Sequence, residues 1–146
     1  MPSKLRTASW VILALMGAVI LLISLASARL AYGGDYPIGG VSVAEVAAGR
    51  EGVLTALRGI RGTSAAYAAG FAVLYLVVVL GPYRRGEVWS WWALFAGALA
   101  IALFVLARAP LLGIPMGAGG TGPAFTQTAV IVFGLLLDVG RVIGKR

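Results

Sequence analysis

The sequence predicts an all-α integral membrane protein, a four-helix bundle with a short amphipathic outer helix in its first loop. Of its 146 residues, 60% are hydrophobic and only 12% are charged, whereas soluble domains are typically about 45–50% apolar and about 25% charged. Four nearly uncharged segments also reach the length of about 20 residues that a helix needs to cross a bilayer. No remaining segment is long enough to fold separately, so we expect residues 1–146 to form a single domain.

The four expected spans follow one another with one long connection between the first two. They cover residues 9–28, 55–81, 89–107 and 125–143. The first span contains no charge, and the fourth contains Asp138 and Arg141 in its last turns. Small residues four apart let helix backbones approach each other in lipid. Such pairs occur at Ala14 and Ala18, Ala66 and Gly70, and Ala93 and Gly97. They support a compact bundle without showing dimerisation.

The segment 30–63, which includes the first turns of the second span, contains the predicted outer helix. After a glycine-rich turn, Ser42 and Glu45 have the spacing of a capping box, which starts a helix by satisfying its first backbone N–H groups. We expect this helix over about 43–48, too short to span and lying on the outer surface. The hairpin 81–88 is short and contains Pro82, so spans two and three should be antiparallel neighbours.

The glycine-rich third connection, 108–124, is expected to be a flexible outer loop. Backbone N–H groups in such a loop can bind phosphate, but the Lys-Ser/Thr ending of a P-loop is missing. The amino-terminal MPSKLRT, an apolar run and Ala26-Ser27-Ala28 together resemble a secretory signal peptide. The run is long for such a signal, so we expect the first span to be retained. Cleavage would leave three spans with the amino terminus outside.

Basic residues predict that both termini are cytoplasmic, because short loops rich in Lys and Arg stay inside. The side with the termini holds seven basic residues against Glu87 and Asp138, whereas acids offset the bases of the long first loop. The expected anchors at the inner interface are Trp10, Trp89, Trp91, Trp92, Arg84 and Arg85. Tryptophan belts and arginine attraction to anionic lipid explain this pattern, so we expect no nucleic acid partner.

Charged residues near the spans are costly and therefore worth assessing singly. Asp138 and Arg141 are three residues apart, and we interpret them as an ion pair at the membrane edge; Arg84 and Arg85 are alternative partners for Asp138. A proton or cation site at Asp138 is the competing interpretation. A lone carboxylate without a second acid or a histidine makes a poor proton relay.

Arg58 and Arg61 share a helical face at the outer end of the second span. Antiparallel spans would bring Thr126, Gln127 and Thr128 to the same level. Guanidinium groups bind carboxylates and phosphates through paired hydrogen bonds, so these five residues form a candidate site for a lipid head group or small anion. The alternative is structural: Asp35, Glu45 or Glu51 neutralise the arginines and hold the first loop against the bundle.

The residue pattern resembles uncharacterised four-helix bacterial inner-membrane proteins, which are broadly similar to DoxX-like small membrane proteins. The resemblance rests on a basic start with a first span, the Ser-x-x-Glu helix, LRGIRGTSAA, and YRRGEVWSWWAL before two more spans. It covers most of the chain and implies a four-helix bundle in the bacterial cytoplasmic membrane. It implies no known catalytic residue.

The absence of Cys and His from the sequence excludes disulfides, thiolate nucleophiles and the usual haem and zinc ligands. We therefore expect no enzyme activity, no cofactor and no metal. The leading hypothesis is a protein that acts by association, as an accessory or scaffold subunit that contacts membrane lipids and other membrane subunits or a second copy. A binder of a lipid or small hydrophobic anion is the alternative. Transport through an oligomer ranks third.

Overall fold

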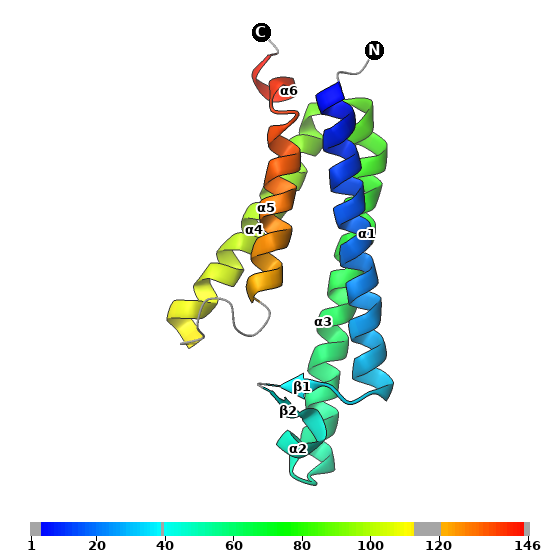
Figure 1. Ribbon diagram of the computed structural model, residues 1–146, viewed down its shortest axis with the longest axis vertical. Helices are drawn as coiled ribbons and strands as arrows, with labels where there is room; N and C mark the ends of the chain where they lie inside the picture. Colours follow the sequence, from blue (N-terminus) through cyan, green and yellow to red (C-terminus); the bar gives the residue numbers. More distant parts are fainter. Residues whose placement is uncertain (1–3, 39, 113–120, 145–146) are drawn as a thin grey trace. The chain divides into compact units, whose positions relative to one another are not determined.

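The computed structural model describes residues 4–38, 40–112 and 121–144, and these are mostly helical (Figure 1). The helices are α1 (Lys4–Gly33), α2 (Val43–Ala47), α3 (Glu51–Val78), the π-helix η1 (Val79–Tyr83), α4 (Val88–Leu112), α5 (Thr121–Leu136) and α6 (Gly140–Ile143). The strands β1 (Pro37–Ile38) and β2 (Val41–Ser42) pair antiparallel, with Pro37 opposite Ser42.

Three of the described helical segments are long and apolar enough to cross a membrane. They are Lys4–Gly33, Glu51–Tyr83 and Val88–Arg108. The membrane-type helical character expected from the composition is therefore confirmed. Each segment extends beyond the span expected at its position, because the helical hydrogen-bond pattern continues into the less apolar flanks.

The fourth expected span differs from the prediction of one uninterrupted helix over 125–143. The helix α5 has 16 residues, which at 1.5 Å per residue is about 24 Å, less than the hydrocarbon core of about 30 Å. Its end tightens, because the N–H groups of Asp138 and Val139 bond to carbonyls only three residues back. A turn then separates α5 from α6. A fourth crossing, and with it the four-helix bundle, stays a prediction.

The connection between α3 and α4 is shorter than the expected hairpin over 81–88. The chain stays helical past Pro82, which lies inside η1. Proline lacks the N–H that an α-helix needs at an interior position, and the wider π-helical turn accommodates it. The Pro82 carbonyl accepts from the N–H groups of Gly86 and Glu87 at 3.1 and 3.0 Å. Gly86 has φ +96°, a left-handed conformation that glycine adopts readily.

The chain forms two compact units: unit 1 is Met1–Gly17 with Tyr75–Arg146, and unit 2 is Ala18–Leu74. The described part of unit 1 packs α1 closely against its neighbours. A Cβ added at Gly134 would lie 2.8 Å from Leu13 Cδ2, and one added at Gly17 would lie 2.7 Å from Leu76 Cδ2. The core of this unit includes Leu13, Val79, Tyr83, Trp91, Leu94, Ala98, Ile131 and Leu135. The expectation of a single domain stays a prediction.

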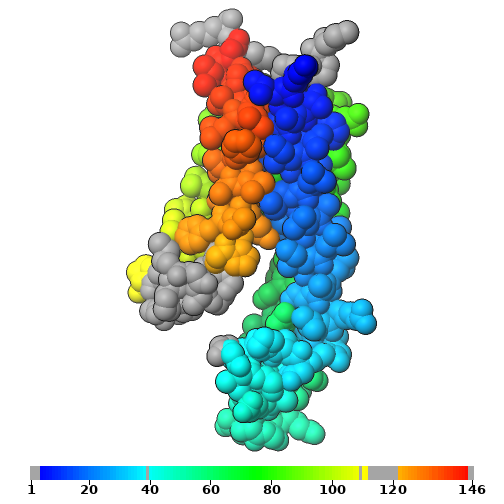
Figure 2. Space-filling view, viewed as in Figure 1, coloured from blue at the N-terminus to red at the C-terminus, as the bar shows by residue number. Residues whose placement is uncertain are grey.

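Unit 2 contains the later part of α1, the β-hairpin, α2 and most of α3, and its cyan hairpin and α2 pack together beside the start of α3 (Figure 2). Ser42 caps α2, because its Oγ accepts from the Glu45 N–H at 3.1 Å. Ala48 ends this helix with φ 48°. The short helix is thus present over Val43–Ala47, while its place on the outer membrane surface stays a prediction. At Gly62, an added Cβ would lie 2.8 Å from the Tyr32 ring.

Candidate functional site

A buried polar cluster in unit 1 joins Ser9 of α1 to Tyr83 of η1 and Gly134 of α5. Ser9 and Tyr83 are both 0% exposed. The Ser9 Oγ donates to the Gly134 carbonyl at 2.6 Å and lies 2.6 Å from the Tyr83 hydroxyl. Because a serine hydroxyl has one proton and the carbonyl can only accept, the Tyr83 hydroxyl donates to Ser9. The bare backbone of Gly134 lets α1 come close enough for this arrangement.

Arg141 of α6 also contacts this cluster. Its Nη1 donates to the Tyr83 carbonyl at 2.8 Å, and its guanidinium carbon lies 4.2 Å from the centre of the Tyr83 ring. Its Nη2 forms an ion pair with Asp138 in which both side chains are largely buried, 6% and 11% exposed. The structure thus brings together the two residues interpreted as an ion pair, and Arg84 and Arg85 have other contacts.

Basic and aromatic residues also contact each other around the α3–α4 connection of unit 1. The Arg84 guanidinium lies 4.9 Å from the Trp10 ring centre, and Arg6 Nη2 donates to the Arg84 carbonyl at 3.1 Å. Glu87 accepts from Trp89 Nε1 at 2.7 Å and from Arg85 Nε at 2.9 Å. These two hydrogen bonds, the one from Trp89 first, lower the pKa of Glu87 from its ordinary value.

The tryptophans that follow the α3–α4 connection divide into two groups. Trp89 and Trp92 are exposed, 55% and 52%, whereas Trp91 is only 7% exposed. Trp91 Nε1 donates to the Leu135 carbonyl at 3.0 Å, and its ring stacks on Phe95. The expectation that Trp91 is an interface anchor is therefore corrected. Trp91 lies two residues after Trp89, and two helical steps of about 100° each turn its side chain to the opposite face of the helix, which packs into the core.

In unit 2, Arg58 and Arg61 of α3 contact both the last turns of α1 and the segment that follows it, an arrangement that we call the loop clamp. Arg58 Nη2 donates to the Gly34 carbonyl at 3.3 Å, and Arg61 Nε donates to Ser27 Oγ at 3.2 Å. The Arg61 guanidinium also lies 4.0 Å from the centre of the Tyr36 ring, and the Tyr36 hydroxyl donates to the Leu57 carbonyl at 3.1 Å.

The loop clamp uses different partners from those expected for a structural role. The sequence suggested Asp35, Glu45 or Glu51 as the neutralising groups, but within the described residues the only ion pairs are Arg85–Glu87 and Arg141–Asp138. Carbonyl, hydroxyl and aromatic groups contact the two arginines instead. Sequence patterns do not mark backbone carbonyls as partners, which is why the carboxylates were the obvious candidates.

The other residues of the candidate anion site lie in the other unit. Thr126, Gln127 and Thr128 belong to α5 in unit 1, and Arg58 and Arg61 belong to unit 2. Both threonine hydroxyls donate to the carbonyls four residues earlier, those of Gly122 and Ala124, at 3.2 and 2.9 Å. A site shared by these five residues stays a prediction.

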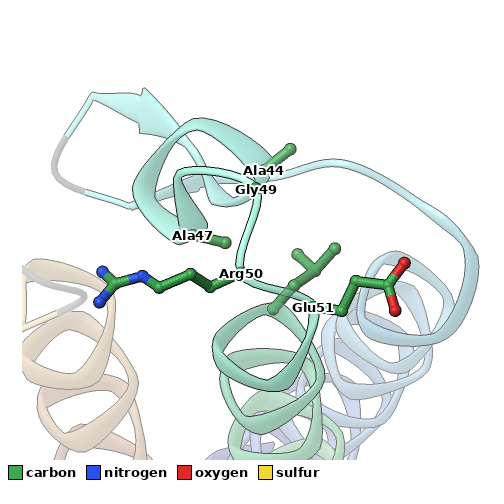
Figure 3. Close-up of a pocket in the computed structure, with 6 residues that line it drawn as sticks. Ala44, Ala47, Gly49, Arg50 and Glu51 are labelled. Carbon is green, nitrogen blue, oxygen red and sulfur yellow. The ribbon is translucent and has the colours of Figure 1, made fainter.

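An open cavity of about 260 Å³ lies between α2 and the first turn of α3 (Figure 3). Its lining residues are Ala44, Ala47, Gly49, Arg50, Glu51 and Leu54. Arg50 and Glu51 extend in opposite directions, so their charges do not converge on one point. Among the residues that the structure describes, no group of three or more His, Cys, Asp or Glu side chains could hold a metal ion.

Sequence reasoning missed Ser9, Tyr83 and Gly134 of the buried polar cluster. It also missed Tyr36 of the loop clamp. Ser9 and Gly134 each offered a signal, because a hydroxyl or a missing side chain inside an apolar helix often marks a helix contact. No protein-family model, curated protein or solved structure matches this chain. A functional proposal therefore depends on the geometry of these residues.

Proposed function

We propose that this chain is a non-catalytic integral membrane protein that acts by association, as an accessory or scaffold subunit of a larger membrane complex. One observation carries the proposal: the polar side chains of the buried polar cluster and of the loop clamp each make at least one contact with their own chain. Ser9, Arg141 and Arg58 donate to the carbonyls of Gly134, Tyr83 and Gly34. Polar groups used in this way tie helices and loops together, which suits a rigid platform for partners.

A surface of α3 supports association more directly. We call it the small-residue face, and it consists of Gly52, Gly59, Ala66 and Gly70. Spacings of seven and four residues place them on one side of the helix, and all four are exposed. A Cβ added at any of the three glycines meets nothing within 4 Å. Small residues of this kind let a second transmembrane helix approach closely.

The proposed location is the bacterial cytoplasmic membrane, with both termini in the cytoplasm. The support is the clustering of positive charge at one end of unit 1, where the start of α1 contacts the α3–α4 connection through Arg6 and Arg84. Arg141 of α6 contacts Tyr83 next to the same connection. Basic segments of this kind stay on the cytoplasmic side during insertion.

Native mass spectrometry after solubilisation in mild detergent tests the proposal. We expect a mass above that of one chain, from a partner subunit or a second copy. Gly59→Leu should reduce the associated fraction at least about fivefold, because a branched side chain keeps a facing helix away. Gly33→Leu is the matched control, since an added Cβ at that position also meets nothing within 4 Å. A strictly monomeric particle without a partner at every concentration would contradict the proposal.

The second candidate is a binder of a lipid or small hydrophobic anion at Arg58 and Arg61, between the predicted spans two and four. One observation favours it: the Nε of Arg58 is buried and has no hydrogen-bond partner within the described residues. A guanidinium with a remaining donor suits a carboxylate or phosphate oxygen. The candidate ranks second because the clamp already occupies other donors of both arginines.

A further inference from the structure

Exposed cations and exposed indoles are neighbours at the α3–α4 connection of unit 1. Arg84 and Arg85 are exposed, and the Arg85 side chain is 68% exposed even though it pairs with Glu87. Trp89 and Trp92 follow in the first turns of α4 with more than half of their surface exposed. The polar boundary of a bilayer favours both large aromatic groups and cations.

The charges at this end of unit 1 are unbalanced. The residues that the structure describes at this end include five bases, Lys4, Arg6, Arg84, Arg85 and Arg141, and two acids, Glu87 and Asp138. Asp138 is paired with Arg141, and Glu87 with Arg85. Within the described ranges, no carboxylate lies within 4.0 Å of the Arg84 guanidinium, which is stacked on Trp10 instead. The Arg84 guanidinium therefore remains available to an external anion.

Neighbouring contacts orient these groups before any ligand arrives. Trp10 supports the Arg84 guanidinium from one side. Glu87 binds both Arg85 and Trp89, with one carboxylate oxygen for each, and so holds a cation next to an indole. Trp92 lies three residues beyond Trp89, about 4.5 Å further along the helix axis. Along the chain, the two arginines come first and the two indoles follow towards the apolar part of α4. A lipid leaflet has the same order, with the head-group phosphates outside and the acyl chains beneath them.

We propose that Arg84, Arg85, Trp89 and Trp92 form a binding site for an anionic phospholipid, the hairpin lipid site. The head-group phosphate accepts hydrogen bonds from the two guanidinium groups, and the acyl chains lie along the exposed indoles of α4. Charge complementarity selects an anionic lipid over a zwitterionic one, because the ammonium of a zwitterionic head group offsets its phosphate. Glu87 acts as a positioning residue. The site goes beyond the proposed function, since it requires no protein partner.

Titration of the detergent-solubilised chain with phosphatidylglycerol, followed by native mass spectrometry, tests the site. A single arginine near an anionic lipid surface contributes about a fivefold gain in binding. Arg84→Gln with Arg85→Gln should therefore weaken phosphatidylglycerol binding about 25-fold and change phosphatidylcholine binding little. The matched control, Arg29→Gln with Arg108→Gln, removes the same charge from residues that are not part of the site and should change the affinity less than about threefold. Equal losses in both double variants would overturn the proposal.

Salt dependence of the unmodified chain provides a test that does not depend on folding of a variant. Raising the salt concentration from about 0.1 M to about 1 M shortens the Debye length from about 10 Å to about 3 Å. Phosphatidylglycerol binding should fall at least about fivefold, while phosphatidylcholine binding stays constant. A salt-independent preference would overturn the proposal. Inorganic phosphate should not compete with the lipid, because it makes no contact with the indoles; effective competition would indicate a simple anion site and also overturn it.

Discussion

The Tyr83 hydroxyl and the Ser9 Oγ lie 2.6 Å apart in the interior of unit 1, although 74 positions separate them in the sequence. Ser9 donates its own proton to the Gly134 carbonyl, so one small hydroxyl links three helical segments. Arg141 links α6 to the same cluster, because its guanidinium lies over the Tyr83 ring and donates to the Tyr83 carbonyl. Removing a member of this cluster should therefore loosen the whole unit rather than one helix.

Replacing Ser9 by Ala should destabilise the folded protein by about 1–2 kcal/mol, since the Tyr83 hydroxyl loses its acceptor in a buried place. Unfolding in detergent micelles, followed by tryptophan fluorescence, measures the effect. Ser64→Ala is the control, because the exposed Ser64 hydroxyl bonds only to the carbonyl of Ile60 in its own helix. Equal effects of the two substitutions would show that the Ser9 contact contributes nothing.

Gly134→Ala should destabilise unit 1 by about 1–3 kcal/mol, because the added methyl would lie 2.8 Å from Leu13 Cδ2 and force repacking. Gly140→Ala is the matched control, since nothing lies within 4 Å of a Cβ at that position. The control should be neutral or slightly stabilising, as alanine is the better helix former. Unfolding midpoints of the two variants give the comparison.

Arg58→Gln with Arg61→Gln should lower the thermal unfolding midpoint and leave the co-purifying lipid unchanged. The physical reason is the loop clamp, in which the two guanidinium groups hold Gly34, Ser27 and Tyr36. Thermal unfolding and lipid mass spectrometry on the same samples separate the two candidate roles. Loss of a specific lipid with an unchanged midpoint would favour the binder over the clamp.

Stability should depend on Glu87 at acidic pH. Its hydrogen bonds from Trp89 and Arg85 lower its pKa in the folded state from the ordinary value of 4.5. The folded state therefore favours the ionised carboxylate, so the stabilisation is fully present above the unfolded pKa and is lost as the pH falls through the folded pKa. Glu87→Gln should remove this contribution to the acid dependence. Unfolding midpoints measured from pH 7 down to about pH 3 should differ in slope between the two proteins.

Asp138→Asn should destabilise unit 1 by about 3 kcal/mol, because it leaves the largely buried Arg141 without its ionic partner. Asp138→Asn with Arg141→Gln should recover part of this loss, since no uncompensated charge remains. Unfolding in micelles measures both variants. The single variant also tests the transport hypothesis: a proton flux into vesicles that exists in the parent chain and disappears in Asp138→Asn would favour transport over the structural ion pair.

Much of the local structure follows from the sequence, for reasons of short-range physics. Apolar segments long enough to span a bilayer correspond to the three long helices, and the Ser42–Glu45 spacing marks the start of α2. The ion pair of Asp138 with Arg141 is also local, since three residues separate them in the chain. In each case the decisive groups lie close together in the chain, so their distance is set by helix geometry.

Only the tertiary structure decided which polar groups meet across the chain. Trp91 binds the Leu135 carbonyl in the core, while its neighbours Trp89 and Trp92 stay exposed. Arg58 donates a hydrogen bond to the Gly34 carbonyl rather than to a carboxylate. Composition and spacing do not encode these choices, because backbone carbonyls are the same at every residue and become partners only where packing brings a donor to them. The sequence by itself determined the membrane-type helices, and the packing determined how their few polar groups are used.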